Sequence, residues 1–416
     1  MSKLKGAVLI GQSGGPTSVI NASALGCIEA ALKSENVTKV YGAAHGIKGV
    51  LDDHLYDMNQ EDKKELALMR NTPSSVLGTC RYKLKDFTED DTDYKRILEI
   101  FKKYDVRYFF YNGGNDSMDT CNKISRYMAQ NDYEIRVMGI PKTIDNDLAL
   151  TDHCPGFGSA AKYIATSCME IYRDAKVYGT GSITVLEIMG RNAGWLTAAS
   201  AIAAYKDMGP DLIYLPEVPF DLDRFIADVK KVYDEKGDVL VAVSEGIVDK
   251  EGRYISELLA SGDKSKDSFG HVQMGGLAST LANYANNKIK AKVRGIEFGI
   301  IQRCAAHIAS ETDVNEAYLA GETAFRAAES GETDRMVAFE RGEGPEYSCK
   351  TVLVPLAQVA NFEKKVPREW INAEGNGILK PFIDYALPLI QGENKVPMED
   401  GVPRFANLKK IKTCPK

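Results

Sequence analysis

The densest group of reactive side chains in the sequence lies in the run Pro141–Asp147, which reads Pro-Lys-Thr-Ile-Asp-Asn-Asp. The run follows a short apolar segment, so we expect it at the end of a β-strand. A fixed carboxylate can take a proton from an alcohol, and a nearby cation stabilises a phosphoryl group. An ordinary turn would explain Asp145 and Asp147, but not Lys142 and Thr143 beside them. The run therefore predicts a catalytic site for proton or phosphoryl transfer.

Two glycine-rich turns lie between predicted strands and predicted helices. In the first, the adjacent residues Gly14 and Gly15 allow backbone N–H groups to turn toward an anion, and the following helix N-terminus adds partial positive charge. A plain tight turn is the alternative, because Gly-Gly turns are common. The second turn, Gly113–Ser117, contains Asp116, which either caps a helix or senses a metal or a phosphate. No G-x-x-x-x-G-K-[ST] motif occurs, so the chain is not a P-loop NTPase.

Single charged residues follow other predicted strands. Arg191 and Glu245 each stand at such a strand end, where charged residues are usually solvated. Arg294 and Arg303 flank a short apolar strand, and the arginine fork suits phosphate monoesters. Each of these arginines could equally form a surface ion pair. Alone, none of the four residues indicates a site.

The segment Gly156–Ala161 matches the dinucleotide-binding pattern G-x-G-x-x-A, which would indicate an oxidoreductase. That pattern normally follows a hydrophobic strand, whereas Cys154 and Pro155 precede it here. We therefore expect the N-terminal turn of a helix at this segment.

The elements that must position these residues alternate along the chain. Short β-branched or aromatic runs predict strands at 7–10, 106–111, 135–140, 183–188, 239–243 and 293–298. Helical patterns follow the first two of them, over about 17–33 and to about 129. The alternation predicts an α/β fold with largely parallel sheets, and a domain boundary is expected near Cys154. Ligands bind beyond the carboxyl ends of such strands, which is where the reactive residues fall.

Composition excludes several classes of protein. The 416 residues include 58 acidic and 52 basic side chains, and the net charge of -6 argues against nucleic acid as the main partner. The 8 cysteines form no C-x-x-C pair, which indicates a reduced, cytoplasmic chain without a cysteine metal site. No apolar run is long enough to predict a membrane span.

Taken together, the motifs resemble the phosphofructokinase family from about residue 5 to about residue 310. The most specific are Thr-Ile-Asp-Asn-Asp at 143–147 and Met-Gly-Arg at 189–191. The resemblance implies two Rossmann-like, doubly wound domains with the active site in the cleft between them. Residues 1–154 with part of 305–350 would bind the phosphoryl donor, and residues 155–304 with part of the C-terminal segment would bind a sugar phosphate. It also implies that fructose 1,6-bisphosphate is made from fructose 6-phosphate with Mg²⁺.

The resemblance assigns roles residue by residue. Asp145 matches the general base for the sugar 1-hydroxyl, Thr143 touches the transferring phosphoryl group, and Arg191 stabilises charge in the transition state. Further residues would contact the sugar phosphate: Ile144, Asp147, Met189, Gly190, Glu245, Arg294, Ile300 and Arg303. Others would contact the phosphoryl donor: Gly14, Gly15, Arg81, Gly114, Asp116, Ser117 and Lys142. Arg294 would reach across from a neighbouring subunit, so we expect a homo-oligomer, either a dimer or a tetramer.

Two departures from the family pattern concern the donor. Members that use ATP generally have glycine where this chain has Asp116, and often where it has Lys142. A carboxylate at the first position would repel the α-phosphate of a nucleotide by about 4 kcal/mol, at ~4 Å and an effective dielectric constant of about 20. A lysine at the second can neutralise the terminal phosphates in the transition state. Both residues are typical of the pyrophosphate-dependent branch, so we expect pyrophosphate as the donor.

Three further departures affect ligand sites. Asn115 stands where the family usually has a metal-binding aspartate; its amide oxygen can bind Mg²⁺ but adds no charge. Ser182 replaces an arginine that commonly donates across the subunit interface, and Ile300 replaces a histidine that contacts the sugar phosphate. Another sugar phosphate therefore remains open as the substrate.

The expected function is the reversible transfer of a phosphoryl group from pyrophosphate to fructose 6-phosphate, in glycolysis or gluconeogenesis. The alternatives are an ATP-dependent 6-phosphofructokinase and a non-catalytic regulatory subunit of the same fold. Against the second, Lys142, Asp145 and Arg191 are all present.

Overall fold

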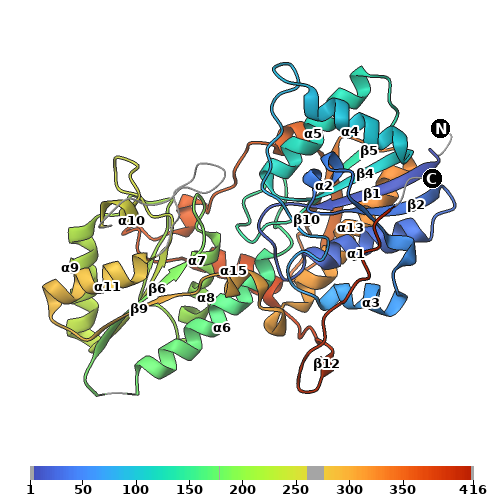
Figure 1. Ribbon diagram of the computed structural model, residues 1–416. Coiled ribbons are helices and arrows are strands. Elements are labelled where there is room, and N and C mark those ends of the chain that lie inside the picture. The colour runs from blue at the N-terminus through green and yellow to red at the C-terminus, as the bar shows by residue number, and fades with distance from the viewer. Residues whose placement is uncertain (1–3, 178, 260–275, 414–416) are drawn as a thin grey trace.

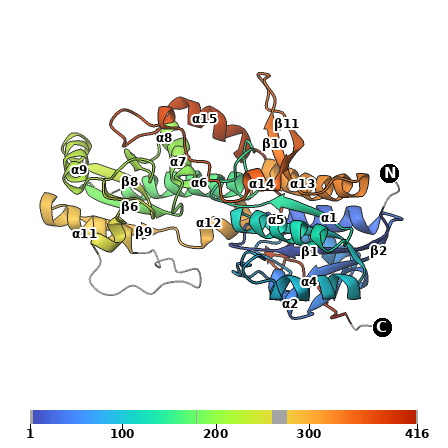
Figure 2. The ribbon, with the colours of Figure 1, turned by 90° about the horizontal axis from the view of Figure 1, so that it is seen from above.

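The computed structural model describes residues 4–177, 179–259 and 276–413. The described residues form two mostly parallel sheets, each with its own helices, which stand side by side in Figures 1 and 2. The α/β fold with largely parallel sheets that the sequence predicted is thus confirmed.

The first sheet has seven strands among the described residues, in the order β11-β10-β5-β4-β1-β2-β3. Its five inner strands run parallel, whereas β3 and β11 pair antiparallel at the two edges. The strand bounds are β1 Gly6–Gln12, β2 Val37–Ala43, β3 Leu55–Asp57, β4 Val106–Gly113, β5 Arg136–Pro141, β10 Arg335–Arg341 and β11 Cys349–Pro355.

The second sheet has four described strands, all parallel, in the order β7-β8-β6-β9. Their bounds are β6 Ser182–Ile188, β7 Leu212–Tyr214, β8 Asp238–Ser244 and β9 Val293–Glu297. A short hairpin near the end of the chain joins β12 Met398–Glu399 to β13 Val402–Pro403.

Helices cover both sheets. The α-helices are α1 Ile20–Leu32, α2 Ile47–Leu51, α3 Lys63–Leu68, α4 Thr92–Lys103, α5 Asn115–Gln130, α6 Phe157–Ala175, α7 Trp195–Ala199, α8 Ala201–Tyr205, α9 Leu222–Lys236, α10 Ile255–Leu258, α11 Leu277–Ile289, α12 Ile301–Cys304, α13 Glu311–Ser330, α14 Leu356–Val359 and α15 Lys380–Ala386. The 3₁₀ helices are η1 Met58–Gln60, η2 Met69–Asn71, η3 Ala306–Ile308, η4 Arg368–Trp370 and η5 Leu387–Ile390. None of the described helices combines the length and the apolarity that crossing a bilayer requires.

The alternating side chains of each strand enter two different cores. Val8 and Ile10 of β1 pack with α1 and α13 on one face of the first sheet, whereas Leu9 packs with α2, α4 and α5 on the other. The second sheet has the same construction, with α6 to α8 on one face and α9 and α11 on the other. Because both faces are covered, the inner strands β1, β4 and β8 are almost continuously buried.

The contact between α1 and α13 ties a late part of the chain to the first sheet. A Cβ atom at Gly26 would lie 2.1 Å from the carbonyl oxygen of Tyr318, and one at Gly321 would lie 1.8 Å from that of Ser23. Only glycine allows the two helix backbones to approach so closely. We propose that the chain divides near Cys154, with α13, β10 and β11 joined to the N-terminal domain.

Local hydrogen bonding moves one predicted helix start, and a second predicted start is found in place. The first helix begins at Ile20 rather than near Thr17, because the Thr17 hydroxyl accepts the N–H of Val19 at 3.2 Å. The segment Gly156–Ala161 starts α6, with Gly156 at φ 112°. The helix turn predicted there is confirmed.

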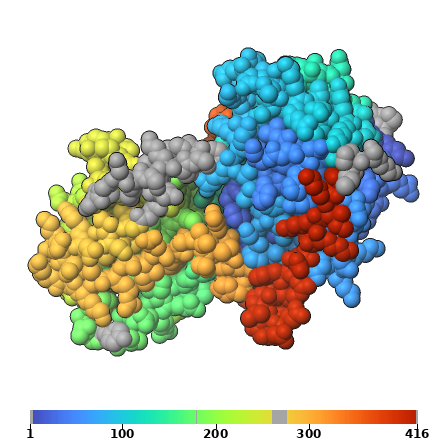
Figure 3. Space-filling view, in the orientation of Figure 1, coloured from blue at the N-terminus to red at the C-terminus, as the bar shows by residue number. Residues whose placement is uncertain are grey.

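The end of the chain returns to the first domain. Beyond β13 it passes α3 in Figure 3, where the Glu65 side chain accepts the N–H of Asn407 at 2.6 Å. Further on, Glu61 accepts the N–H of Lys409 at 2.7 Å. These contacts fasten the C-terminal segment to the N-terminal domain.

Candidate active site between the two sheets

A cleft of about 730 Å³ lies between the carboxyl ends of the two sheets. It is lined by most of the residues that the sequence singled out: Gly14, Gly15, Arg81, Gly114, Asn115, Asp116, Ser117, Lys142, Thr143, Ile144, Asp145, Asp147, Met189, Arg191, Glu245 and Arg303. They come from segments up to about 290 residues apart, so the tertiary structure gathers them in one place.

Strand register explains why these segments meet. Gly113 at the end of β4 pairs with Pro141 at the end of β5, and the N–H of Lys142 continues the ladder to the Gly113 carbonyl at 3.1 Å. In the second sheet Ile188 pairs with Ser244, so the residues that follow β6 and β8 are neighbours. The strand ends thus place each loop beside its partners in the cleft.

Two cationic side chains, Lys142 and Arg303, lie against the Gly14-Gly15 turn. The Lys142 ammonium donates to the Gly15 carbonyl at 2.6 Å, and a Cβ at Gly14, where φ is 75°, would stand 3.4 Å from Lys142 Nζ. A Cβ at Gly15 would stand 3.3 Å from an Arg303 guanidinium nitrogen. The two glycines therefore leave room for positive charge against the turn, and this arrangement suits an anionic ligand.

Burial shifts the pKa values of Lys142 and Asp145 toward neutrality. The Lys142 pKa falls to about 8, chiefly because the ammonium loses hydration, with Arg303 and Arg81 adding to the fall. The Asp145 pKa rises to about 7, chiefly through desolvation and then through the carboxylates of Asp147 and Glu245. An acid whose pKa lies near 7 suits general base catalysis at neutral pH.

Asn146, to which the sequence assigned no role, holds the loop between β5 and α6 in place. Asn146 is buried and has φ 54°. Its side-chain NH₂ group donates to the Tyr385 hydroxyl at 2.8 Å, and its side-chain oxygen Oδ1 accepts the N–H of Cys154 at 2.9 Å. The Thr143 hydroxyl accepts the N–H of Asp145 at 3.0 Å. The loop between β5 and α6 is therefore pinned on both sides of Asp145.

Asn115 and Asp147 present oxygens that are suited to a hard cation. The Asn115 amide donates to Asp147 Oδ2 at 3.3 Å, whereas the Oδ1 atom of each residue is buried with no hydrogen-bond partner among the described residues. Burial raises the pKa of Asp147, and the nearby carboxylate of Glu363 raises it further. Two buried oxygens without donors, beside clustered negative charge, fit the ligand preference of Mg²⁺.

Positive and negative side chains balance in the cleft. Among the residues that the structure describes, five basic and five acidic side chains line it: Arg81, Lys83, Lys142, Arg191 and Arg303, and Asp116, Asp145, Asp147, Glu245 and Glu363. A neutral cleft gives little net attraction to a polyanion, so two phosphorylated ligands would need a divalent cation beside them.

The surroundings of Asp116 reduce the repulsion expected from the sequence. Its side chain is 60% exposed at the start of α5, and its carboxylate lies 3.6 Å from Lys83 Nζ. In solvent of dielectric constant near 80, two charges ~4 Å apart interact by about 1 kcal/mol rather than about 4. The carboxylate still occupies the donor end of the cleft, but its charge alone excludes a nucleotide less strongly than predicted.

Three predicted residues lie outside this cleft. The Gly190 N–H approaches Glu245 Oε1 at 3.4 Å without lining the cavity. Arg294 pairs with Asp174 at 2.9 Å in a small pocket beside Ser182, so it does not serve the cleft of its own chain. Ile300 also does not line the cleft: it is 60% exposed and follows Gly299, which has φ 53°.

No sequence motif indicated that a late segment, 361–366, reaches the cleft, which Asn361 and Glu363 line. Glu363 accepts the Asn192 amide at 2.7 Å, and the N–H of Lys364 bonds to the Asp147 carbonyl at 2.7 Å. The Lys364 carbonyl accepts the Trp195 indole N–H at 2.8 Å. The segment therefore links the loop after β5 to the loop after β6. Other lining residues missed by the sequence are Ser13, Pro16, Cys80, Tyr82, Lys83, Asn192 and Asn361.

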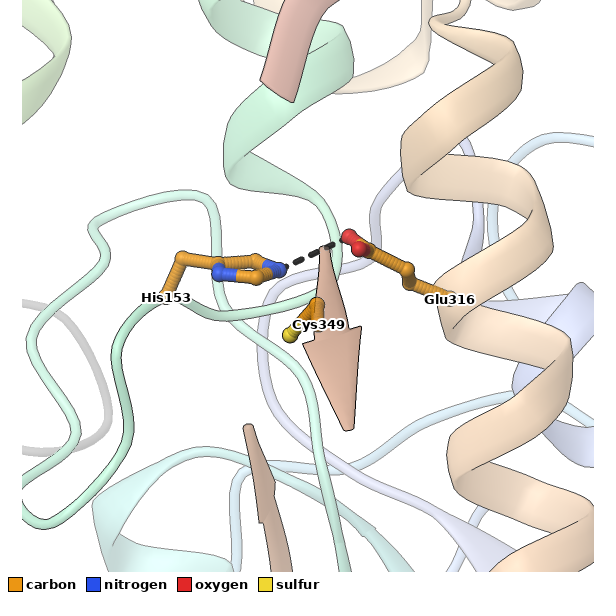
Figure 4. A group of neighbouring side chains, drawn as sticks. All are labelled: His153, Glu316 and Cys349. Atoms are coloured by element: carbon orange, nitrogen blue, oxygen red, sulfur yellow. Dashed lines mark hydrogen bonds and ion pairs between the residues drawn. The ribbon is translucent and has the colours of Figure 1, made fainter. Parts of the chain in front are cut away.

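A buried charge cluster lies where the loop between β5 and α6 meets α13 and β11 (Figure 4). His153 Nδ1 lies 2.8 Å from Asp152 Oδ2. Its Nε2 lies 2.8 Å from Glu316 Oε2, the contact that is dashed in Figure 4. Cys349 Sγ is close enough to complete a metal-ligand group, but both ring nitrogens already face carboxylates. The two carboxylates overcome burial and raise the pKa of His153, so we interpret the cluster as a structural imidazolium.

The cluster predicts a pH-dependent stability. Because the pKa of His153 is raised on folding, its contribution is complete below about 6.5 and is lost as pH rises through the folded-state pKa. We expect His153→Gln to cost about 3 kcal/mol of unfolding free energy at pH 6 and clearly less at pH 9. Denaturant unfolding at both pH values measures this, with the exposed His307→Gln as the control. Equal losses at both pH values would contradict the imidazolium.

Comparisons with known proteins agree with the kind of site that the residues of the cleft indicate. A family model described as Phosphofructokinase matches residues 7–297. The pyrophosphate–fructose 6-phosphate 1-phosphotransferase of Halomonas elongata is 43% identical over 403 residues, 96% of this chain and 95% of that protein. The protein of the same name from Methylococcus capsulatus is 42% identical over 95% of this chain and 94% of its own length. The crystal structure of the pyrophosphate-dependent phosphofructokinase from Nitrosospira multiformis superposes with a TM-score of 0.88 at 38% identity, over 99% of this chain and 98% of that one.

Proposed function

Because this chain belongs to the phosphofructokinase family, we propose that it transfers a phosphoryl group reversibly from pyrophosphate to the 1-hydroxyl of fructose 6-phosphate. The products are fructose 1,6-bisphosphate and phosphate. The observation that carries the proposal is the cleft, where Asp145 with its raised pKa lies among Lys142, Arg191 and Arg303. The names of the relatives at 42–43% identity support the same donor and acceptor.

In the proposed mechanism Asp145 takes the proton of the sugar 1-hydroxyl as the oxygen attacks the distal phosphoryl group in line. Lys142 and Arg191 stabilise the charge that spreads over the phosphoryl oxygens, while Thr143 contacts the same group. The sugar phosphate lies on Ile144, Met189, Glu245 and Arg303, which line the cleft. Positioning of the reacting groups accounts for most of the catalysis, and the hydrogen bonds of Asn146 hold the loop that positions Asp145.

Pyrophosphate lies against the Gly14-Gly15 turn, Arg81 and the start of α5 from Gly114 to Ser117. Backbone N–H groups at a helix N-terminus and a buried lysine are suited to a compact polyanion. Asp116 stands at the end of this region and limits its length. Pyrophosphate fits that limited space better than a nucleotide does.

Mg²⁺ fits the oxygens of Asn115 and Asp147, and we propose these two residues as its protein ligands. When bound, the ion supplies positive charge that offsets the phosphate charges. The two Oδ1 atoms would gain the partner that the protein itself does not provide. Asp147 also contributes the carboxylate charge that Asn115 lacks.

We further propose a homo-oligomer, a dimer or a tetramer, in which Arg294 of one subunit serves the sugar-phosphate site of its neighbour. Its position outside the cleft of its own chain is consistent with that role. We also propose a cytoplasmic location, which the seven described cysteines, all free thiols, support.

The donor assignment predicts a clear preference in a direct assay. With fructose 6-phosphate and Mg²⁺, we expect pyrophosphate to support a kcat/KM at least 100-fold above that with ATP. We also expect fructose 1,6-bisphosphate and phosphate to react in reverse, because the free energies of hydrolysis of pyrophosphate and of the 1-phosphate ester are close. Initial rates in both directions measure this. Comparable or higher rates with ATP would contradict the assignment.

A further inference from the structure

The segment Thr79–Leu84 crosses the donor end of the cleft without forming a helix or a strand, yet it is tethered along its length. The Thr79 hydroxyl donates to the Gly14 carbonyl at 2.7 Å, and the Gly14 N–H donates to the Cys80 carbonyl at 3.3 Å. At the other end Lys123 of α5 donates to the Leu84 carbonyl at 3.0 Å. The segment is thus fastened both to the phosphate-binding turn and to the helix that carries Asp116.

Two basic residues of this segment, Arg81 and Lys83, line the cleft. Between them the Tyr82 hydroxyl donates to Asp93 at 2.7 Å, and this bond anchors the segment to α4. Lys83 Nζ lies 3.6 Å from Asp116 Oδ1, and the two side chains are 56% and 60% exposed. An ion pair this exposed is weak, so its ammonium can be drawn to a stronger anion.

Asp116 poses an electrostatic problem for the proposed donor. A carboxylate at the donor end repels pyrophosphate as well as a nucleotide, so its charge must be offset when pyrophosphate binds. Lys83 is the cation placed to do this, because it faces both Asp116 and the open cleft. Its ammonium can lie between the carboxylate and the phosphate that is not transferred.

On the basis of the proposed function, we propose that Lys83 is a pyrophosphate-binding residue whose ammonium contacts the leaving phosphate. With Asp116 it forms the end wall of a donor site that accommodates two phosphates. Lys142 and Arg81 hold the phosphoryl groups nearer the acceptor, and Lys83 holds the far end. The Lys83–Asp116 pair thus determines donor length through a cation as well as a carboxylate.

Equilibrium binding of methylenediphosphonate, a non-hydrolysable pyrophosphate analogue, tests this in the presence of Mg²⁺. We expect Lys83→Met to raise the Kd at least about tenfold, the loss typical of one charged hydrogen bond, without changing the KM for fructose 6-phosphate. The matched control is Lys85→Met, because Lys85 pairs with Asp90 at 3.1 Å and does not line the cleft. The Kd of that variant should stay within about twofold of wild type.

The same substitution in an Asp116→Asn background separates contact from neutralisation. If Lys83 touches the ligand, its removal still weakens binding about tenfold there. A loss that disappears in that background would overturn the proposal, because Lys83 would then only neutralise Asp116. An unchanged Kd for Lys83→Met would overturn it as well. If wild type itself fails to bind the analogue and to use pyrophosphate, the proposed function fails and the role of Lys83 fails with it.

Discussion

Replacing Asp145 with Asn should lower kcat by about 10²–10⁴-fold, the usual loss when a general base is removed. The amide has nearly the same shape but cannot accept the proton of the sugar hydroxyl. We also expect the pH profile to change. In wild type kcat/KM should fall below pH about 7, where Asp145 becomes protonated, and the variant should lose this dependence. Steady-state rates between pH 5.5 and 9 measure both effects.

Stability provides the control for this experiment. The pKa of Asp145 is raised on folding, so its ionised carboxylate disfavours the folded state at pH values above its unfolded pKa. At pH 8 the Asp145→Asn variant should therefore unfold at a temperature no lower than wild type. Reduced activity in a protein of equal or higher stability assigns the loss to chemistry. An unchanged kcat in the folded variant would show that Asp145 is not the base.

The second large effect is expected from replacing Asp116 and Lys142 together with Gly. Removing the carboxylate opens the donor end of the cleft, and its repulsion of about 1 kcal/mol at this exposed position corresponds to roughly a 5-fold gain in ATP affinity. Removing Lys142 takes away the cation that contacts the Gly15 carbonyl, so activity with pyrophosphate should fall at least about 100-fold. Titration calorimetry with ATP and rates with each donor measure the two changes.

The single variants separate the two contributions. Asp116→Gly alone should account for most of the gain in ATP binding, because Asp116 is the residue at the end of the donor region. Lys142→Gly alone should account for most of the loss with pyrophosphate. If the double variant binds ATP no better than wild type does, the exclusion of nucleotide does not depend on Asp116.

Local sequence patterns predicted most of the elements that carry the site. The alternation of apolar runs and helical patterns placed β1, β4, β5, β6, β8 and β9 within a few residues of their observed bounds. The turn residues Gly14 and Gly15 and the run Lys142–Asp147 fall at strand ends, as expected. Such patterns are reliable because side-chain periodicity and turn chemistry act over only a few residues.

Contacts between distant segments could not be predicted in this way. Asn146 looked like one more turn residue, but its partner Tyr385 lies 239 residues further along the chain. Glu363 lies in a polar stretch that resembles a surface loop, yet it bonds Asn192 in the cleft. The resemblance predicted Ile300 at the sugar phosphate, whereas Ile300 is 60% exposed and does not line the cleft of its own chain.

The sequence by itself determined the side chains that are available: a carboxylate, a lysine and a threonine together at the end of β5, and two glycine-rich turns at strand ends. The tertiary structure decided how those groups behave. Burial beside Asp147 and Glu245 raises the pKa of Asp145 to about 7. Solvent around the exposed Asp116–Lys83 pair screens the charge of Asp116. Both effects depend on hydration and on neighbours brought together by packing, and neither is encoded in the spacing of residues along the chain.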